Sequence, residues 1–280
     1  MADFPSTTIE KVSVSRLLMG TNWWLGFSHT SQAQDRLINE YMTAERIATI
    51  IEVFLSAGVN GMVGTRPGEK LMKAIAMAED RTGRGVVKIS SPTLPVAEGQ
   101  AAMDESARIL DAQAAIGTTF CLPHQQTTDA LLDRTTRTIR RMDRVCTMIR
   151  ERGMIPGLST HMPETVPYAD EMDLDVATYI QIYNAAGFLM QIELDWVHRI
   201  IWNAKRPVIV IKPLAAGRLM PLAGLAFTWA TIRDKDMVCV GTQSPDEARE
   251  VIEISLSLLE RRVPAMDLQR TRSKQSVEKA

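Results

Sequence analysis

The second half of the chain contains four apolar segments, each of which runs directly into a cluster of small polar residues. They span residues 155–161, 179–184, 208–219 and 237–244, and stretches with helical spacing separate them. An apolar run, a polar cluster and a helix repeated in series are typical of a parallel α/β barrel. Functional residues of such barrels lie at the carboxyl ends of the strands, where these clusters fall.

The rest of the chain continues the same alternation. Strands are predicted at residues 16–20, 59–64, 86–90, 118–122, 155–159, 179–183, 208–212 and 237–241. Helices are predicted at residues 44–56, 69–78, 101–115, 129–152, 190–204 and 245–261. Eight strands alternating with helices close into a (β/α)8 TIM barrel. An open doubly wound sheet is the alternative, but no glycine-rich dinucleotide motif follows the first strand.

Two local features refine this prediction. Ser244 is a predicted N-cap, because Pro245 occupies the first helical position and Glu247 follows three residues after the cap. Pro163 is predicted to open a helix in a similar way. The polar segment 28–41 follows the first strand, and the sequence leaves open whether it crosses the barrel mouth or forms a surface loop.

Length and composition indicate one domain. A chain of 280 residues with 45% hydrophobic content can form a single TIM-barrel domain over residues 1–280, with a polar tail from about residue 262. A net charge of −1 favours neither nucleic acid nor a membrane surface as a partner, and the sequence does not indicate an oligomeric state. Three widely spaced cysteines, with no signal peptide and no long apolar span, predict a cytoplasmic protein.

The residues at the predicted strand ends resemble those of the aldo-keto reductase superfamily. The similarity lies in residues 157–161, 180–184, 212–219 and 241–250, and in the first half in residues 57–60 and 68–71. Each motif is weak alone, but four of them in the right order and spacing are fairly specific. The resemblance implies a TIM barrel that binds NAD or NADP at the carboxyl ends of its strands.

The resemblance also assigns cofactor-binding residues. Ser159 and Gln181 would hold the nicotinamide carboxamide. Small residues and backbone N–H groups of the loop 213–219 would surround the pyrophosphate, with Pro213, Leu214, Gly217 and Leu219 as the matching positions. Gln243, Ser244 and Glu247 would lie beside the adenosine. Neither Gln243 nor Ser244 is basic, so the expected partner of the additional NADP phosphate is missing.

Most of the family's catalytic residues are replaced in this chain. The reductases use an Asp, a Tyr, a Lys and a His, with the Tyr as general acid. His124 matches the His, but Val63 stands in place of the Asp and Ser91 in place of the Lys. The segment 65–68 contains no Tyr. General acid catalysis contributes about 10²–10⁴-fold, so we predict that this protein is not an ordinary carbonyl reductase.

Other polar and aromatic residues are predicted at the barrel mouth. Trp23, Arg66 and His161 are candidates for binding a small polar or sugar-like substrate. Trp23 and its neighbour Trp24 are either a stacking wall or core residues, and Arg66 either binds an anion or is a solvated turn residue.

Two groups at the strand ends suggest other chemistry. His29, His124 and His161 could bind zinc, but their spacing has no recognisable signature and no metal ligand is assigned. Lys212 is either a structural residue or a Schiff-base nucleophile. The sequence therefore leaves three hypotheses: a divergent aldo-keto-reductase-like oxidoreductase, a lyase or isomerase with or without the help of a metal ion, and a non-catalytic binding protein.

Overall fold

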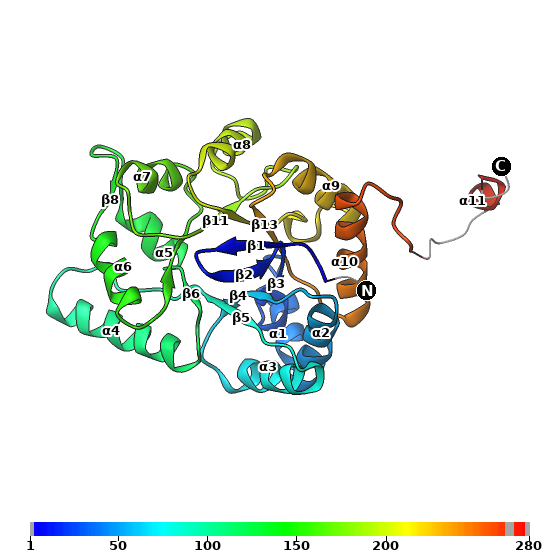
Figure 1. Cartoon of the computed structure of the whole chain (residues 1–280), viewed down its shortest axis with the longest axis horizontal. Helices are drawn as coiled ribbons and strands as arrows, with labels where there is room; N and C mark the ends of the chain where they lie inside the picture. Colours follow the sequence, from blue (N-terminus) through cyan, green and yellow to red (C-terminus); the bar gives the residue numbers. More distant parts are fainter. Residues whose placement is uncertain (1–2, 267–271, 278–280) are drawn as a thin grey trace.

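Parallel strands form a barrel in the computed structural model, which describes residues 3–266 and 272–277 (Figure 1). Within these residues nine strand segments form one sheet, in the order β10-β11-β12-β13-β3-β4-β5-β6-β9. Their bounds are β3 (Leu17–Gly20), β4 (Gly61–Thr65), β5 (Val87–Ser90), β6 (Phe120–Cys121), β9 (Ile155–Pro156), β10 (Leu158–Ser159), β11 (Tyr179–Ile182), β12 (Val208–Ile211) and β13 (Met237–Val240). Each segment lies within a predicted strand or extends it by one residue, and the predicted (β/α)8 barrel is confirmed.

The barrel closes through a single interrupted strand. β9 pairs with β6 and β10 pairs with β11, and only Gly157 separates the two halves. A Cβ atom at Gly157 would lie 2.6 Å from the carbonyl oxygen of Thr178 and 2.8 Å from Cγ of Leu122. Glycine is therefore required here by the close approach of a neighbouring backbone.

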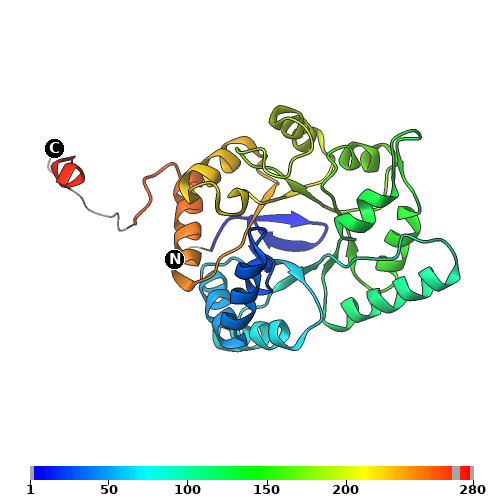
Figure 2. The same cartoon turned by 180° about the vertical axis from the view of Figure 1, so that it is seen from behind.

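Helices surround the barrel, as Figures 1 and 2 show from opposite sides. Their bounds are α2 (Ala44–Ser56), α3 (Glu69–Thr82), α4 (Gln100–Ala115), α6 (Met142–Arg150), α7 (Thr165–Glu171), α8 (Leu194–Asn203), α9 (Pro221–Thr231) and α10 (Pro245–Leu259). α2 has the predicted limits, and Ile47, Ile51 and Phe54 on its inner face are fully buried. None of the helices in the described residues is long and apolar enough to cross a membrane.

The prediction of one helix over residues 129–152 was wrong. The structure has there a 3-10 turn η2 (Asp129–Leu131), a short hairpin of β7 (Leu132–Asp133) and β8 (Thr138–Ile139), and only then α6. Oδ1 of Asp133 accepts hydrogen bonds from the backbone N–H groups of Thr135 and Thr136. Such side-chain turns compete with the helical ladder, and a run of threonines adds little helix propensity to oppose them.

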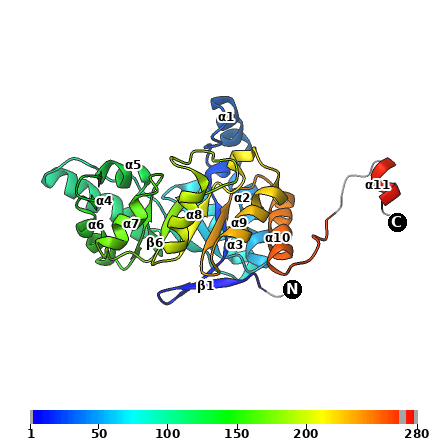
Figure 3. The ribbon, with the colours of Figure 1, turned by 90° about the horizontal axis from the view of Figure 1, so that it is seen from above.

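The polar segment 28–41 is neither a simple loop nor a cover over the whole mouth. It forms α1 (Gln32–Tyr41), whose N-cap Ser31 accepts from the N–H of Gln34. Figure 3 shows that α1 stands out from the barrel at one end. The predicted polar tail includes α11 (Arg272–Val277), and residues 267–271 and 278–280 of this tail lie outside the described residues.

An N-terminal hairpin that the sequence did not reveal closes the other end of the barrel (Figure 3). β1 (Ser6–Ile9) pairs antiparallel with β2 (Val12–Ser15). Ile9 and Val14 belong to the same buried cluster as Leu18, Phe120 and Ile209 in the barrel interior. The hairpin therefore fills the amino-terminal end of the barrel, and only the opposite end is open to ligands.

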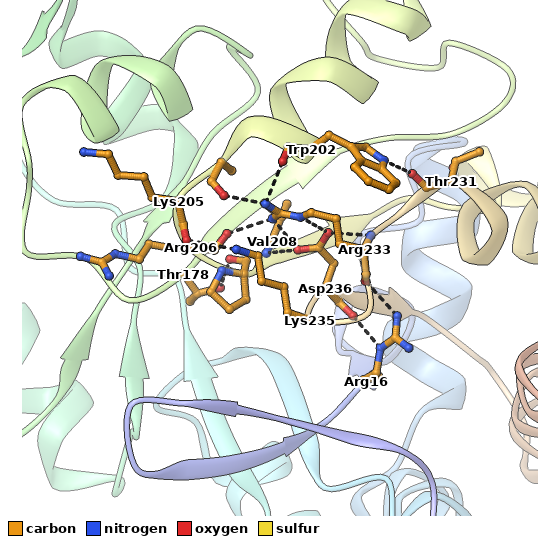
Figure 4. A network of polar contacts seen from close by, with 12 residues as sticks. Arg16, Thr178, Trp202, Lys205, Arg206, Val208, Thr231, Arg233, Lys235 and Asp236 are labelled. Atoms are coloured by element: carbon orange, nitrogen blue, oxygen red, sulfur yellow. Dashed lines mark hydrogen bonds and ion pairs between the residues drawn. The ribbon is translucent and has the colours of Figure 1, made fainter.

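A buried ion pair connects the amino ends of β12 and β13 (Figure 4). The guanidinium of Arg233 lies 2.7 Å from the carboxylate of Asp236, whose side chain is fully buried. Asp236 also accepts from the N–H of Val208 at the start of β12, and Arg233 donates to the carbonyl of Ala204. Nε of Arg16 donates to the carbonyl of Asp236. The network therefore holds these strand ends in place at the end of the barrel opposite the open mouth.

Candidate functional site

A cavity of about 910 Å³ lies at the carboxyl ends of the barrel strands. Residues that follow β3, β4, β5, β6, β10, β12 and β13 line it. Its volume is in the range of small-molecule and cofactor sites, and its position is that of the active sites of TIM-barrel enzymes.

Most of the residues that the sequence suggested line this cavity. The lining contains the catalytic candidate His124, the substrate candidates Trp23, Arg66 and His161, and the cofactor candidates Ser159, Pro213, Leu214, Gly217, Leu219, Gln243 and Glu247. Gln181 and Ser244 do not belong to the lining. Gln181 is 1% exposed, and its Oε1 is buried with no hydrogen-bond partner among the described residues.

Ser244 and Glu247 serve first as a helix cap. The N–H of Glu247 donates to Oγ of Ser244 over 3.1 Å, and Oε2 of Glu247 accepts from the N–H of Gln243 over 2.6 Å. This reciprocal pair starts α10 as the sequence predicted. The carboxylate of Glu247 is thus fixed at the edge of the cavity by the backbone.

The loop after β12 is a tight turn that contains η3 (Ala215–Gly217). The N–H groups of Ala215, Gly217 and Leu219 donate to the carbonyls of Lys212 and Leu214 within the loop. These three donors are satisfied internally, so fewer amides face a phosphate than the sequence suggested. Gly217 has a φ of +86°, and no atom lies within 4 Å of the place where a Cβ would be. A ligand can therefore approach the backbone closely at Gly217.

The positions of the replaced catalytic residues lie in the same cavity. Val63, Ser91 and His124, which the resemblance compares with three of the reductase positions, all line it. The four tyrosines of the chain are all among the described residues, and none of them lines the cavity. No tyrosine from elsewhere in the fold therefore takes the place of the missing proton donor.

Three histidines and a lysine form the basic part of the cavity. Burial, together with the charge of Lys212, lowers the pKa of His161 to about 4. Burial and Lys212 also lower the pKa of His29 and of His124. Nδ1 of His124 accepts from the N–H of Gln126 over 3.3 Å, which leaves Nε2 as the proton-bearing nitrogen. These histidines are neutral at pH 7.

The zinc site considered from the sequence is not formed. Among residues 3–266 and 272–277, no three His, Cys, Asp or Glu side chains lie close enough together to hold a metal ion. Instead, Nε2 of His29 lies 3.2 Å from the side-chain nitrogen of Asn22.

The adjacent tryptophans have different positions. Trp24 is fully buried and its Nε1 donates to the carbonyl of Thr242 over 2.7 Å. Trp23 lines the cavity, and a Cβ at Gly241 would lie 2.6 Å from its Cδ1. Thus Trp24 is a core residue, whereas Trp23 forms a wall. The guanidinium of Arg66 lies 4.9 Å from the centre of the Phe27 ring, where it is exposed beside the cavity.

Two lining residues were missed as site residues. Gln113 is 5% exposed on the inner face of α4, and its buried Oε1 has no hydrogen-bond partner in the described part of the chain. Its only sequence signal is its spacing of three residues from Leu110 on the buried face of the helix, which also contains the polar residue Ser106. Lys212 was considered but not assigned, because its surroundings depend on three other strands.

Comparison with solved structures gives the fold of aldo-keto reductases. A candidate aldo-keto reductase from Pseudomonas aeruginosa is 15% identical with a TM-score of 0.65, and the match covers 91% of this chain and 94% of that one. A glycerol dehydrogenase from Gluconobacter oxydans is 13% identical with a TM-score of 0.57, over 95% and 98% of the two chains. An aldose reductase from Giardia lamblia is 12% identical with a TM-score of 0.55, over 93% and 90%.

The sequence itself has no comparable match. No protein-family model and no curated protein sequence matches the chain. At 12–15% identity, similarity to the three structures concerns the fold and not the reaction. The chain has the TIM-barrel fold of the aldo-keto reductases, with a cavity at the end of the barrel where such enzymes act.

Proposed function

We propose that the protein is a divergent member of the aldo-keto reductase superfamily that binds NAD or NADP in the cavity at the strand ends. The main support is that three segments corresponding to cofactor-binding motifs meet in one cavity. Ser159 comes from β10, Gly217 from the loop after β12 and Gln243 from the start of α10. The volume of the cavity and the open space at Gly217 fit a dinucleotide.

The residues of the cavity suggest how a ligand would be held. Gly217 permits close approach of a phosphate to the backbone, and Trp23 offers an aromatic face. The side chain of Ser159 can hydrogen-bond a carboxamide. A bound nicotinamide would supply hydride chemistry, while His124 can donate a hydrogen bond from Nε2 to a substrate oxygen.

The missing general acid limits the reaction. Without a tyrosine in the cavity, a carbonyl group that accepts hydride at its carbon has only weak donors near it to protonate its oxygen. We therefore expect slow turnover of simple aldehydes and a small polar or sugar-like substrate that contributes its own binding groups. Robust NADPH-dependent reduction of simple aldehydes, abolished by His124→Ala, would contradict this expectation.

Tryptophan fluorescence tests cofactor binding directly. NADH and NADPH titrated separately should quench the emission of the protein, and Trp23→Phe should remove most of that quenching. Trp202→Phe is the matched control, because Trp202 is 53% exposed and lies outside the cavity. Absence of quenching by both nucleotides would overturn the proposal. Comparing the dissociation constants of NADH and NADPH, titrated under the same conditions, shows which of the two cofactors the protein prefers.

A lyase or isomerase reaction on the same barrel is the second candidate. The observation that favours it is Lys212, which lies in the cavity wall without a carboxylate partner among the described residues.

A further inference from the structure

Lys212 is the only lysine among the described residues that lines the cavity. It follows the last residue of β12, at the end of the barrel that is open to ligands. We propose that Lys212 is a nucleophile that forms an imine with a small carbonyl compound carrying a carboxylate or phosphate group. This inference does not depend on nicotinamide binding.

The backbone at Lys212 directs its side chain into the cavity. Successive side chains of a strand point to opposite faces, yet Ile211 and Lys212 both line the cavity. Lys212 has a φ of 58°, which breaks the alternation. This left-handed conformation is unfavourable for a lysine, and more so before Pro213. Its carbonyl accepts from the N–H of Ala215 over 2.9 Å, which holds the strained turn in place.

The surroundings of Lys212 favour a neutral amine. Ile180, Ile211 and Cys239 line the same part of the cavity wall, and burial raises the pKa of the Cys239 thiol to about 12. Neither an ion pair nor a side-chain hydrogen bond of Lys212 is found in the described part of the chain. Burial lowers the pKa of Lys212, because no anion offsets the cost of removing its charge from water. A neutral amine has the lone pair that a nucleophile needs.

Neutral imidazoles lie close to this amine. In its protonated form Lys212 lowers the pKa values of His124 and His161, so the two rings and the amine are electrostatically coupled. His124 presents Nε2–H as a donor, because its Nδ1 is occupied by the N–H of Gln126. These rings can donate and accept the protons that imine formation moves.

The proposed step is a condensation without any redox change. Nζ of Lys212 attacks the carbonyl carbon, the C–N bond forms, and one proton passes from nitrogen to oxygen to give a neutral carbinolamine. A second proton reaches the hydroxyl group, the C–O bond breaks and water leaves, and nitrogen gives its remaining proton to a neighbouring base. The products are one C=N bond and one water molecule, so atoms and electrons balance.

Arg66 defines the substrate class. Its guanidinium keeps its charge at neutral pH, whereas the three histidines are neutral and Lys212 favours the neutral amine. The acidic lining residues Glu247 and Glu250 both belong to α10. The carboxylate of Glu247 is already bound to the N–H of Gln243. A negative group on the substrate can pair with Arg66 while the carbonyl carbon reaches Lys212.

Reductive trapping tests the proposal. The full-length protein is incubated with pyruvate or with dihydroxyacetone phosphate in the presence of borohydride, without nicotinamide, and the adduct is located by peptide mass spectrometry. We expect one adduct, on Lys212, that Lys212→Met removes and Lys88→Met leaves, since Lys88 lies outside the cavity lining. At least one anionic probe should react about tenfold faster than hydroxyacetone, the value of one charge-assisted hydrogen bond.

A second measurement needs no variant. Competitive acetylation of the wild-type protein at pH 7 should modify Lys212 ahead of exposed Lys205, because a neutral amine reacts and an ammonium does not. In the trapping experiment, adducts spread over surface lysines or no adduct with either probe would overturn the proposal. In the acetylation experiment, modification of Lys212 no faster than that of Lys205 would overturn it as well. Equal trapping of hydroxyacetone would remove the anionic substrate class. Since neither assay contains a nicotinamide, these failures are distinguishable from a failure to bind NAD(P).

Discussion

At the scale of single residues, the cavity contains four basic side chains whose pKa values are lowered by burial. His29, His124, His161 and Lys212 come from four different segments, and all have a pKa lowered by burial. His161 has the largest shift of the histidines, and its backbone N–H is held by Oδ2 of Asp129 over 3.1 Å. Because His161 lines the cavity and has a lowered pKa in the folded protein, its protonation should make the stability of the fold depend on pH.

The pKa of His161 predicts the response to acid. The folded value is about 4 and the unfolded value about 6.5, so between these pH values the unfolded chain binds more protons. Stability should fall as the pH decreases through this window, and His161→Gln should reduce that fall. Urea unfolding at pH 7, 5.5 and 4.5 measures the free energy of unfolding of both proteins. His198→Gln is the control, because His198 does not line the cavity. Identical pH slopes for wild type and His161→Gln would contradict the prediction.

The close contact between Gly241 and the ring of Trp23 predicts the effect of a larger side chain at position 241. In Gly241→Ala the new methyl group would lie 2.6 Å from Cδ1 of Trp23, so the ring must move. We expect a loss of about 1–3 kcal/mol in unfolding free energy and a shift in tryptophan emission. Gly85→Ala is the control, because its nearest atom is the flexible Oε1 of Glu79 at 3.9 Å. If Gly241→Ala had the same unfolding free energy in chemical denaturation and the same emission spectrum as the wild type, the prediction would be contradicted.

At the scale of elements, a polar network holds the amino ends of β12 and β13, whereas the cavity lies at the carboxyl ends of the strands. Asp236 and Arg233 connect the amino ends of β12 and β13 (Figure 4). Lys212 follows the opposite end of β12, and Gln243 lies in the segment between β13 and α10. A buried pair of this kind is costly to break, because the remaining partner is left without a counter-ion.

Asp236→Asn tests the anchoring of these strands. Removing the charge leaves Arg233, whose side chain is 11% exposed, without its counter-ion, and should destabilise the protein by about 3–5 kcal/mol. Asp234→Asn is a close control, since the Asp234 side chain is fully exposed and 3.8 Å from Arg16. Thermal unfolding compares the two, and equal melting temperatures would show that the network does not anchor β12 and β13.

At the scale of the whole molecule, the barrel is closed by one strand and blocked at one end. Gly157 lies where this strand changes partner from β6 to β11. The N-terminal hairpin fills the amino end with Ile9 and Val14, which leaves a single open mouth. Closure and blockage together explain why the candidate site residues, except Gln181 and Ser244, line one cavity.

Gly157→Ala tests barrel closure. The added methyl group would lie 2.6 Å from a backbone carbonyl, which cannot rotate away as a side chain can. We expect a loss of at least about 1–3 kcal/mol and faster hydrogen exchange in β9, β10 and β11. Gly85→Ala again serves as control. Exchange rates unchanged in these strands would mean that closure does not depend on this close approach.

The sequence by itself determined the alternation of strands and helices, because hydrophobic periodicity and capping residues are local signals. The limits of α2 and the cap at Ser244 were correct for this reason. The order of the strand-end motifs also placed Ser159 and Gly217 in the cavity. The helix expected at 129–152 failed because the side-chain turn at Asp133 competes with the helical pattern.

Only the tertiary structure decided the surroundings of each side chain. Trp23 and Trp24 are identical neighbours in the sequence, yet one lines the cavity and the other is buried. In the sequence Lys212 resembles any other lysine. Only the structure shows that it is partly buried, has a left-handed backbone conformation and lines the same cavity as three histidines. Burial and electrostatic coupling depend on residues far apart in the chain, so the periodicity that predicts a barrel carries no information about them.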